Sequence, residues 1–219
     1  MKPYYSNELT TIYNGDCLDI LRTMQDNSVE LILTDPPYGI NMSKGITNGG
    51  GLAERRTYDD DWDSFTPTQE YFNEMLRVGK NVIIFGGNYF TDKLPQSNHW
   101  IVWDKIGEVM KHSALGDSEL AWTNIKRNSV SLYTQVQQGF ITQEKARYHP
   151  TQKPRELFVE LLQDYNKEKG LVMDCFSGSF TTAIACEQLG IKNISIEKEK
   201  KYCDIGIKRL NELQLKFDI

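Results

Sequence analysis

Short apolar runs alternate with amphipathic stretches along most of this chain. Runs of strand length indicate buried strands, whereas apolar residues repeated at helical spacing indicate helices. The pattern predicts strands over residues 11–13, 29–34, 81–86, 99–104, 119–124, 171–175 and 192–196. It predicts helices over residues 17–24, 67–78, 154–169, 181–189 and from about 200 onward. Strands that alternate with helices favour an α/β fold with a doubly wound, mainly parallel sheet.

Two local signals sharpen the helix boundaries. Residues 66–69, Thr-Pro-Thr-Gln, resemble a capping box with proline at the first helical position. Gly190 follows the helix predicted over residues 181–189, and glycine commonly ends helices in the left-handed conformation. We therefore expect one helix to begin at Pro67 and another to end at Leu189.

The most informative segment is Asp35-Pro36-Pro37-Tyr38, which directly follows the apolar run 29–34. Each proline fixes its own φ, lacks an N–H and forces the preceding residue into an extended conformation. The backbone carbonyls are therefore held rigidly and stay free to accept hydrogen bonds. Asp35 and the Pro36 carbonyl would each accept one N–H of a base amine and make its nitrogen more nucleophilic, while Tyr38 would stack on the base. The alternative is a Pro-Pro turn that closes a core strand, with Tyr38 as ordinary packing.

A second segment has the features of a nucleoside site. The run 171–175 indicates a buried strand, and residues 176–179 lead from it into the helix 181–189. A loop of small residues at a helix N-terminus presents backbone N–H groups and a favourable helix dipole to an anion. Glu197 follows the next strand, about 20 residues after the loop, where nucleotide-binding α/β units hold ribose hydroxyls. A plain helix cap, with Glu197 in a solvated Glu/Lys run, is the alternative.

The composition indicates one globular domain. The chain has 219 residues, of which 39% are hydrophobic and 25% are charged, so we expect a single domain over residues 1–219. No apolar run approaches the roughly 20 residues of a membrane span, and residues 1–10 lack a signal-peptide core. We therefore expect a cytoplasmic protein without membrane contact. The 4 cysteines and 3 histidines lack ligand spacing, which predicts reduced thiols and no metal.

Charge is distributed unevenly along the chain. A net charge of -5 argues superficially against a nucleic-acid partner, because Lys and Arg supply most non-specific affinity for phosphates. Residues 126–155 are nevertheless rich in basic side chains and in amides able to read base edges. We expect a small inserted DNA-reading region at residues 125–148, and a solvated hairpin is the alternative. The predicted phosphate contacts are Lys126, Arg127, Lys145 and Arg147.

A polar, glycine-rich stretch follows the first segment. Residues 41–62 offer little apolar surface to hold them against a core, so we expect a mobile loop. Its basic side chains Lys44, Arg55 and Arg56 are the next candidates for DNA contact.

Three motifs occur in a characteristic order: Asp35-Pro-Pro-Tyr38, then His149-Pro-Thr-Gln-Lys-Pro154, then Asp174-Cys-Phe-Ser-Gly-Ser179. In this order the chain resembles the β-class S-adenosylmethionine-dependent DNA amino-methyltransferases, which methylate N6 of adenine or N4 of cytosine. The match extends from about Tyr13 to Arg209. It implies a Rossmann-like methyltransferase fold with a permuted motif order, in which the catalytic motif precedes the cofactor motif.

The resemblance implies a site-specific DNA methyltransferase that moves the methyl group of S-adenosylmethionine to N6 of an adenine flipped out of double-stranded DNA. Catalysis would depend on Asp35, Pro36, Pro37 and Tyr38. The cofactor-binding residues would be Asp16, Cys17, Asp35, Thr151, Lys153, Asp174, Phe176, Ser177, Gly178, Ser179, Thr181 and Glu197. Among them, Phe176 would pack on the cofactor's adenine, Glu197 would hold its ribose hydroxyls, and Lys153 would lie near its methionine end. No metal or covalent enzyme intermediate is needed.

Phe180 departs from the family pattern, which usually has a glycine at this position in Phe-x-Gly-Ser-Gly-Thr-Thr. Glycine there permits a close approach to the cofactor or an unusual φ. The phenyl ring therefore either turns away from the site or narrows it. We expect it to turn into the core, because the other motif residues are retained.

Several alternatives stay open at this point. The closest is N4-cytosine methylation by the same site, although an aspartate at the first motif position favours adenine in this family. A non-catalytic DNA-binding or partner subunit is the alternative from another class, motivated by Phe180. An RNA or glutamine methyltransferase is weaker, because glutamine-directed relatives resemble Asn-Pro-Pro-Tyr at this motif. A homodimer and a restriction partner are both compatible with the sequence.

Overall fold

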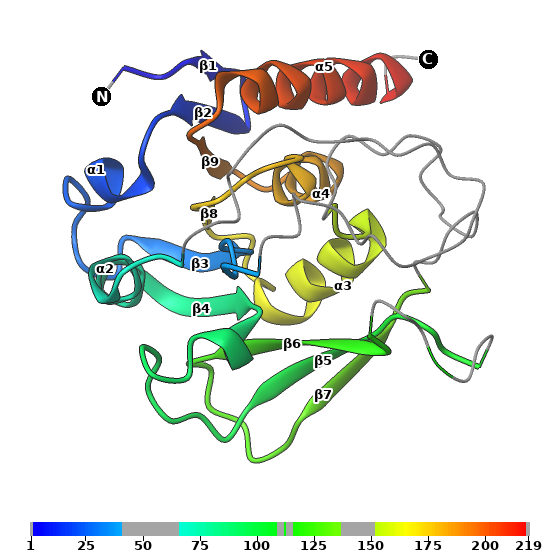
Figure 1. The fold of residues 1–219 in the computed structure, drawn as a ribbon. Helices are drawn as coiled ribbons and strands as arrows, with labels where there is room; N and C mark the ends of the chain where they lie inside the picture. Colours follow the sequence, from blue (N-terminus) through cyan, green and yellow to red (C-terminus); the bar gives the residue numbers. More distant parts are fainter. Residues whose placement is uncertain (1, 41–65, 109–111, 113–115, 137–151, 218–219) are drawn as a thin grey trace.

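One nine-stranded sheet with helices on both faces organises the chain (Figure 1). The computed structural model describes residues 2–40, 66–108, 112, 116–136 and 152–217. The strands are β1 Tyr5–Ser6, β2 Thr10–Asn14, β3 Val29–Thr34, β4 Gly79–Phe85, β5 Trp100–Asp104, β6 Ser118–Thr123, β7 Ser131–Thr134, β8 Val172–Asp174 and β9 Asn193–Glu197. The helices are α1 Cys17–Leu21, α2 Gln69–Val78, the short 3-10 helix η2 Gly87–Tyr89, α3 Arg155–Tyr165, α4 Thr181–Leu189 and α5 Lys200–Phe217.

The strand order is β1-β2-β9-β8-β3-β4-β6-β5-β7, which Figure 1 shows from top to bottom. Strands β1 and β6 run antiparallel to their neighbours, and every other pairing is parallel. The chain continues from β3 to β4 in one direction and from β8 to β9 in the other, while β3 and β8 pair directly. The winding therefore reverses between β3 and β8. This arrangement confirms the predicted doubly wound, mainly parallel sheet.

The residues of β3 show how the sheet forms two cores. Leu31 and Leu33 belong to the apolar cluster that includes Leu161 of α3, whereas Ile32 belongs to the cluster that includes Phe72 of α2. All of these side chains are fully buried. Successive residues of a strand point to opposite faces of the sheet, so a continuous apolar run suits a strand that is covered on both sides.

Several predicted elements are confirmed at both ends. The strand predicted over residues 29–34 is β3, and the helix predicted over residues 181–189 is α4. Gly190 follows α4 with φ 67°, the left-handed conformation expected of a glycine that ends a helix.

The predicted capping box is wrong. Helix α2 begins at Gln69, and Thr68 is its extended N-cap, without a side-chain hydrogen bond to the first turn. Pro67 therefore precedes the helix instead of opening it.

The predicted DNA-reading insert partly belongs to the main sheet. Residues 131–134 form β7, which pairs in parallel with β5 at the sheet edge. Residues 137–148 of that region and the whole predicted loop 41–62 lie outside the described residues. None of the described helices is both long enough and apolar enough to cross a membrane.

Candidate active site

The catalytic and cofactor motifs lie side by side at the reversal of the sheet. Asp35 directly follows β3, and Asp174 is the last residue of the adjacent strand β8. The Thr34 hydroxyl donates to Asp174 Oδ1 over 2.7 Å, and the Phe176 N–H donates to the same oxygen over 3.1 Å. In a doubly wound sheet, ligands bind beyond the carboxyl ends of the strands at this reversal. The hydrogen bond between Thr34 and Asp174, which are 140 positions apart along the chain, thus joins the two motifs in one site.

Two neighbours hold the Asp35 carboxylate. The Tyr38 hydroxyl donates to Oδ1, and the Lys153 ammonium donates to Oδ2 over 2.6 Å. Burial raises the pKa of Asp35, while the Lys153 charge opposes that rise. A carboxylate that would otherwise protonate in a buried setting is therefore stabilised in its charged form by a lysine.

A second carboxylate, which the sequence motifs did not indicate, completes this charge cluster. Glu119, near the start of β6, lies 3.2 Å from the ammonium of Lys153 and 3.2 Å from that of Lys105. Burial raises the pKa of Glu119, but the two lysines outweigh it and lower the pKa overall. Burial likewise lowers the pKa of Lys153, yet the carboxylates of Asp35 and Glu119 raise it overall. The alternating charges of these four residues, Asp35, Lys153, Glu119 and Lys105, balance one another, which offsets the desolvation cost of their partial burial.

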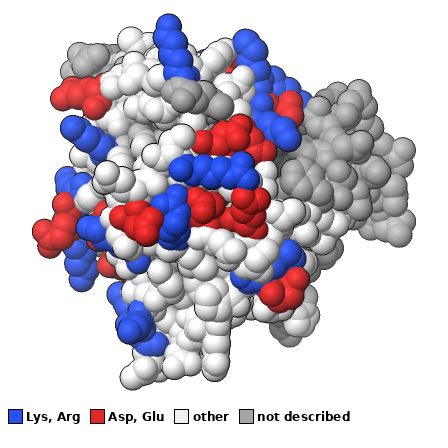
Figure 2. Space-filling model, turned by 90° about the vertical axis from the view of Figure 1, so that its left-hand side faces the viewer, with Lys and Arg blue, Asp and Glu red and all other residues white. Residues whose placement is uncertain are grey.

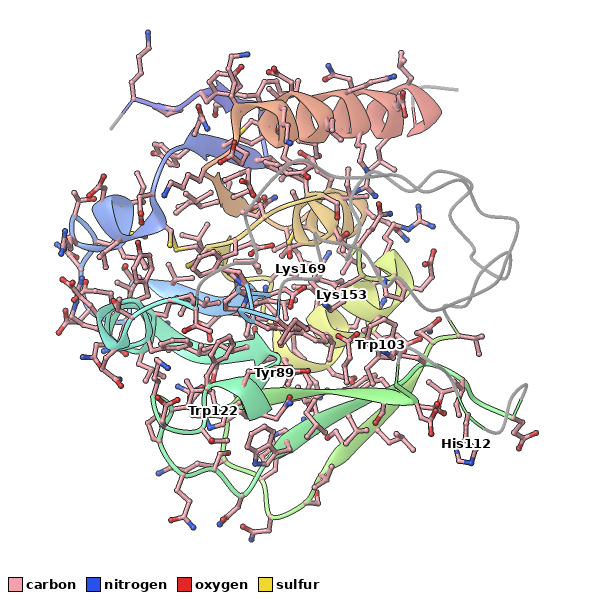
Figure 3. All side chains as sticks on the ribbon, viewed as in Figure 1. Tyr89, Trp103, His112, Trp122, Lys153 and Lys169 are labelled. Atoms are coloured by element: carbon pink, nitrogen blue, oxygen red, sulfur yellow. The ribbon has the colours of Figure 1, made fainter. Side chains whose placement is uncertain are left out.

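Lys153 is labelled in Figure 3, where it lies close to the centre of the site. Its ammonium pairs with Asp35, and its predicted position near the methionine end of the cofactor stays a prediction. Its backbone carbonyl accepts a hydrogen bond from the Thr181 hydroxyl over 3.4 Å at the start of α4. Lys153 thus connects the start of α4 with the Asp35 carboxylate.

Tyr38 is packed between protein groups. Its ring stacks on that of Tyr89, with centroids 4.8 Å apart and planes inclined by 15°. Gly86, at the end of β4, has φ 66°, and a Cβ at this position would lie 2.1 Å from Tyr38 Cε1. Only glycine therefore allows the tyrosine ring to approach this turn. Tyr89 is an aromatic side chain of this site that the motifs did not indicate.

Glu197, the last residue of β9, is held by two backbone N–H groups, and its predicted role toward the cofactor ribose stays a prediction. Its Oε2 accepts the Gly178 N–H over 2.8 Å, and its Oε1 accepts the Glu199 N–H over 2.8 Å. Burial raises the pKa of Glu197 to about 7, against the opposing effect of these N–H groups. The carboxylate is thus oriented by the loop that follows β8, at the position where a ribose hydroxyl would be held.

A tyrosine connects Asp16 with Phe176 on the same side. Asp16 caps α1 by accepting the Leu18 N–H over 3.0 Å, and it accepts the Tyr71 hydroxyl over 2.7 Å. The Tyr71 ring lies 6.2 Å from that of Phe176. These rings offer flat apolar surface for a nucleobase beside the Asp16 carboxylate. Tyr71, on α2, was not indicated by the sequence motifs.

The remaining predicted cofactor residues cluster around the same loop. Cys17 begins α1 and is buried, and Ser177 donates from its hydroxyl to the Asp174 carbonyl over 3.3 Å. The hydroxyls of Ser179 and Thr181 lie 3.1 Å apart. Thr151 lies outside the described residues.

Phe180 turns away from the site, as predicted. It has φ 63° and precedes α4, and its ring is fully buried among Ile12, Ile184 and Leu210. A left-handed backbone explains why a glycine suits this position in the family. The departure therefore changes the packing under α5 and leaves the loop backbone at the site unobstructed by the ring.

Of the basic residues predicted to contact DNA, the two that the structure describes, Lys126 and Arg127, lie away from this site. Lys126 and Arg127 follow the end of β6, and because β6 is antiparallel they lie at the opposite edge of the sheet from Asp35. The Arg127 guanidinium lies 4.7 Å from the centre of the Tyr165 ring. A DNA contact by this pair stays a prediction, and its placement does not support it. Lys44, Arg55, Arg56, Lys145 and Arg147 lie outside the described residues.

The face of the molecule shown in Figure 2 mixes basic and acidic side chains. Among the described residues, Arg77 pairs with Asp26 and Glu74, and Lys80 pairs with Glu30. Each of these two cations is neutralised locally, which lowers its contribution to phosphate binding.

Comparisons with known proteins agree with this geometry. The profile of the DNA methylase family matches residues 87–208. The Type II methyltransferase M.HinfI of Haemophilus influenzae is 27% identical, over 98% of this chain and 72% of its own length. The Type II methyltransferase M2.DpnII of Streptococcus pneumoniae is 26% identical, over 95% of this chain and 92% of its own length.

Solved structures share the fold. A complex of M1.HpyAVI with S-adenosylmethionine superposes with a TM-score of 0.58 at 20% identity, covering 93% of this chain and 100% of that one. The cytosine-N4-specific PvuII DNA methyltransferase superposes with a TM-score of 0.57 at 17% identity, covering 96% of this chain and 95% of that one. The family profile spans more than half of the chain, including β8, α4 and the loop between them. This chain therefore belongs to the DNA methylase family.

Proposed function

We propose that this DNA methylase transfers the methyl group of S-adenosylmethionine to N6 of adenine in double-stranded DNA. The observation that carries the proposal is the juxtaposition of two motifs at the sheet reversal. A lysine-paired carboxylate and an aromatic ring, Asp35 and Tyr38, lie beside the loop between β8 and α4 that carries Phe176. A base amine held at the first motif would face a methyl donor held at the second.

The donor set around the cofactor loop fits S-adenosylmethionine. Glu197 is oriented to accept ribose hydroxyls, and the rings of Phe176 and Tyr71 provide surface for the adenine. The Ser177–Gly178 turn leads into α4, and the first N–H groups of this helix, which begins at Thr181, favour the carboxylate of the methionine end. S-adenosylmethionine, when bound, supplies a methyl group already activated by its sulfonium.

The chain's own residues act on the acceptor. Asp35 and the Pro36 carbonyl would accept the two N–H groups of the amine, which directs its lone pair at the methyl carbon. Burial raises the pKa of Asp35, and the Lys153 ammonium opposes that rise and so favours the charged, hydrogen-bond-accepting form. The protein thus contributes mainly alignment and exclusion of water. The target base must leave the duplex, at a cost of a few kcal/mol, and stacking on Tyr38 offsets part of that cost.

Adenine is favoured over cytosine by the aspartate at the first motif position. Relatives named as Type II methyltransferases support a role in a restriction-modification system. The phosphate contacts are assigned to basic residues outside the described segments, foremost Lys145, Arg147, Arg55 and Arg56, because the described Lys126 and Arg127 lie at the far edge of the sheet.

The test is incubation of the purified chain with labelled S-adenosylmethionine and mixed-sequence DNA, followed by mass spectrometry of the nucleosides. N6-methyladenine is the expected product. N4-methylcytosine would move the activity to the other branch of the family. The absence of any methylated nucleoside, together with retained cofactor binding by calorimetry, would favour a non-catalytic partner subunit.

A further inference from the structure

One face of the Tyr38 ring is already covered in the structure. The Tyr89 ring stacks on Tyr38 with centroids 4.8 Å apart and an inclination of only 15°. Rings at this separation are in direct contact, so a third ring cannot enter between them. At the same time the Tyr38 hydroxyl donates to Asp35 Oδ1, one of the oxygens that the base amine would need. Tyr89 thus occupies the stacking position on Tyr38, and the Tyr38 hydroxyl occupies a hydrogen-bonding position on Asp35 that the acceptor base would use.

Tyr89 is free to leave this position at small cost. It lies in the one-turn helix η2, after the left-handed Gly86, and its side chain is 45% exposed. Tyr38, by contrast, is anchored by Asp35 and approached by the Lys153 ammonium, which lies 5.6 Å from its ring centre. Of the two stacked rings, Tyr89 is therefore the one able to swing into solvent. Figure 3 shows its label at the end of β4, below the site and apart from the cofactor loop.

We propose that Tyr89 is a placeholder for the target base. In the DNA-free enzyme its ring covers the face of Tyr38 on which the extrahelical base stacks, and it leaves when the base enters. The inference rests on the proposed function and adds a positioning residue to it. The exchange replaces one aromatic stack by another, so Tyr38 keeps a stacking partner both before and after base entry. It also makes Tyr89 a competitor of the base, which lowers the apparent affinity for every base by the same factor.

The competition gives the substitution Tyr89→Ala a definite sign. Removing the ring removes the competitor, so capture of the flipped base should become tighter, by about two- to tenfold for one aromatic stack. If Tyr89 instead formed a second wall around the bound base, the same substitution would weaken capture. The exposed position of Tyr89 makes loss of folding an unlikely complication, and thermal unfolding of each variant checks it.

The experiment uses the full chain and a duplex that contains its own methylation site, located beforehand by sequencing methylated DNA. The target adenine is replaced by 2-aminopurine, whose fluorescence reports flipping, and KM and kcat are measured in parallel on the unmodified duplex. Tyr89→Phe keeps the ring and should behave as the parent. Tyr4→Ala removes an exposed tyrosine that directly precedes β1, at the other end of the sheet order from β6, and controls for surface effects.

A lower apparent dissociation constant and KM in Tyr89→Ala, with Tyr89→Phe unchanged, would support the placeholder. Unchanged or weaker base capture in Tyr89→Ala would overturn it, as would the same gain in Tyr89→Phe. Failure of the proposed function is distinguishable, because the parent would then produce no methylated nucleoside from any duplex.

Discussion

The buried ring of Phe180 leads to a prediction in which a second substitution, Gly206→Ala, has opposite effects on stability with and without the ring. Its ring is fully buried between α4 and α5, and a Cβ built on Gly206 of α5 would lie 2.4 Å from its Cδ2. The substitution Phe180→Gly removes that ring, which for a buried phenylalanine costs about 3 to 5 kcal/mol. It also relieves the left-handed backbone at φ 63°, a gain of about 1 to 2 kcal/mol. The net destabilisation should therefore be about 1 to 4 kcal/mol.

Gly206→Ala tests the same contact from the other side. In the parent, the added methyl group meets the Phe180 ring at 2.4 Å and should destabilise the fold by about 1 to 3 kcal/mol through overpacking. In the Phe180→Gly background the ring is absent, and alanine should stabilise the interior of α5 by up to about 1 kcal/mol over glycine. Removing the Phe180 ring should therefore rescue the stability that Gly206→Ala costs in the parent.

Urea unfolding followed by circular dichroism measures the four members of this cycle, and calorimetry measures the affinity of each for S-adenosylmethionine. We expect stability to follow the cycle while cofactor affinity stays within about threefold of the parent, because the ring does not face the site. Additive stability changes would refute the contact between Phe180 and Gly206. A much tighter affinity in Phe180→Gly at unchanged stability would show that the ring obstructs the cofactor.

Three further predictions concern the site and the DNA path. Asp35→Ala should lower kcat by at least about a hundredfold with cofactor affinity retained, because the carboxylate orients the amine. If Asp35→Ala turned over as fast as the surface control Asp92→Ala, that role would be contradicted. Glu197, with a pKa of about 7, binds ribose hydroxyls best as a carboxylate, so cofactor affinity should fall as the pH drops below about 7 and should be flat in Glu197→Gln. The sign for folding is opposite, since a raised carboxyl pKa contributes stability at low pH that is lost as the pH rises toward 7. Replacing Lys126 and Arg127 with alanine should leave the salt dependence of DNA binding unchanged, and a drop in slope of about 1 per residue would restore them to the DNA path.

The sequence predicted best those elements whose signal is complete within the segment itself. Strand β3 is mainly apolar and is followed by Asp35 and a proline pair, and α4 is followed by Gly190, so both were located to the residue. Strand β7 was missed because Tyr133 is its only buried side chain, while Leu132 is exposed at the sheet edge. An edge strand with one buried residue does not differ in pattern from a polar loop.

The site residues divide in the same way. Asp35, Tyr38 and Glu197 belong to contiguous motifs, and the structure places all three at the carboxyl edge of the sheet. Tyr71 and Tyr89 carry no motif of their own. Tyr71 reaches the site from α2 through its bond to Asp16, and Tyr89 reaches it through the turn after β4. Such residues become visible only when the packing of helices and turns is known.

The direction of β6 explains two differences between the sequence analysis and the structure. One is Glu119, which the motifs did not indicate, and the other is the position of Lys126 and Arg127. The strand was expected within a mainly parallel sheet, and a parallel β6 would have placed its last residues, followed by Lys126 and Arg127, at the edge that carries Asp35. The observed strand is antiparallel to β4, so its start lies at that edge instead. Glu119 thereby meets Lys153 at 3.2 Å, and the basic pair is carried to the opposite edge. Hydrophobic periodicity locates a strand but is the same for both directions, because alternation of faces does not depend on polarity. The antiparallel direction of β6 therefore determines which residues form the charge cluster around Asp35. It also places Lys126 and Arg127 away from the edge of the sheet that carries Asp35.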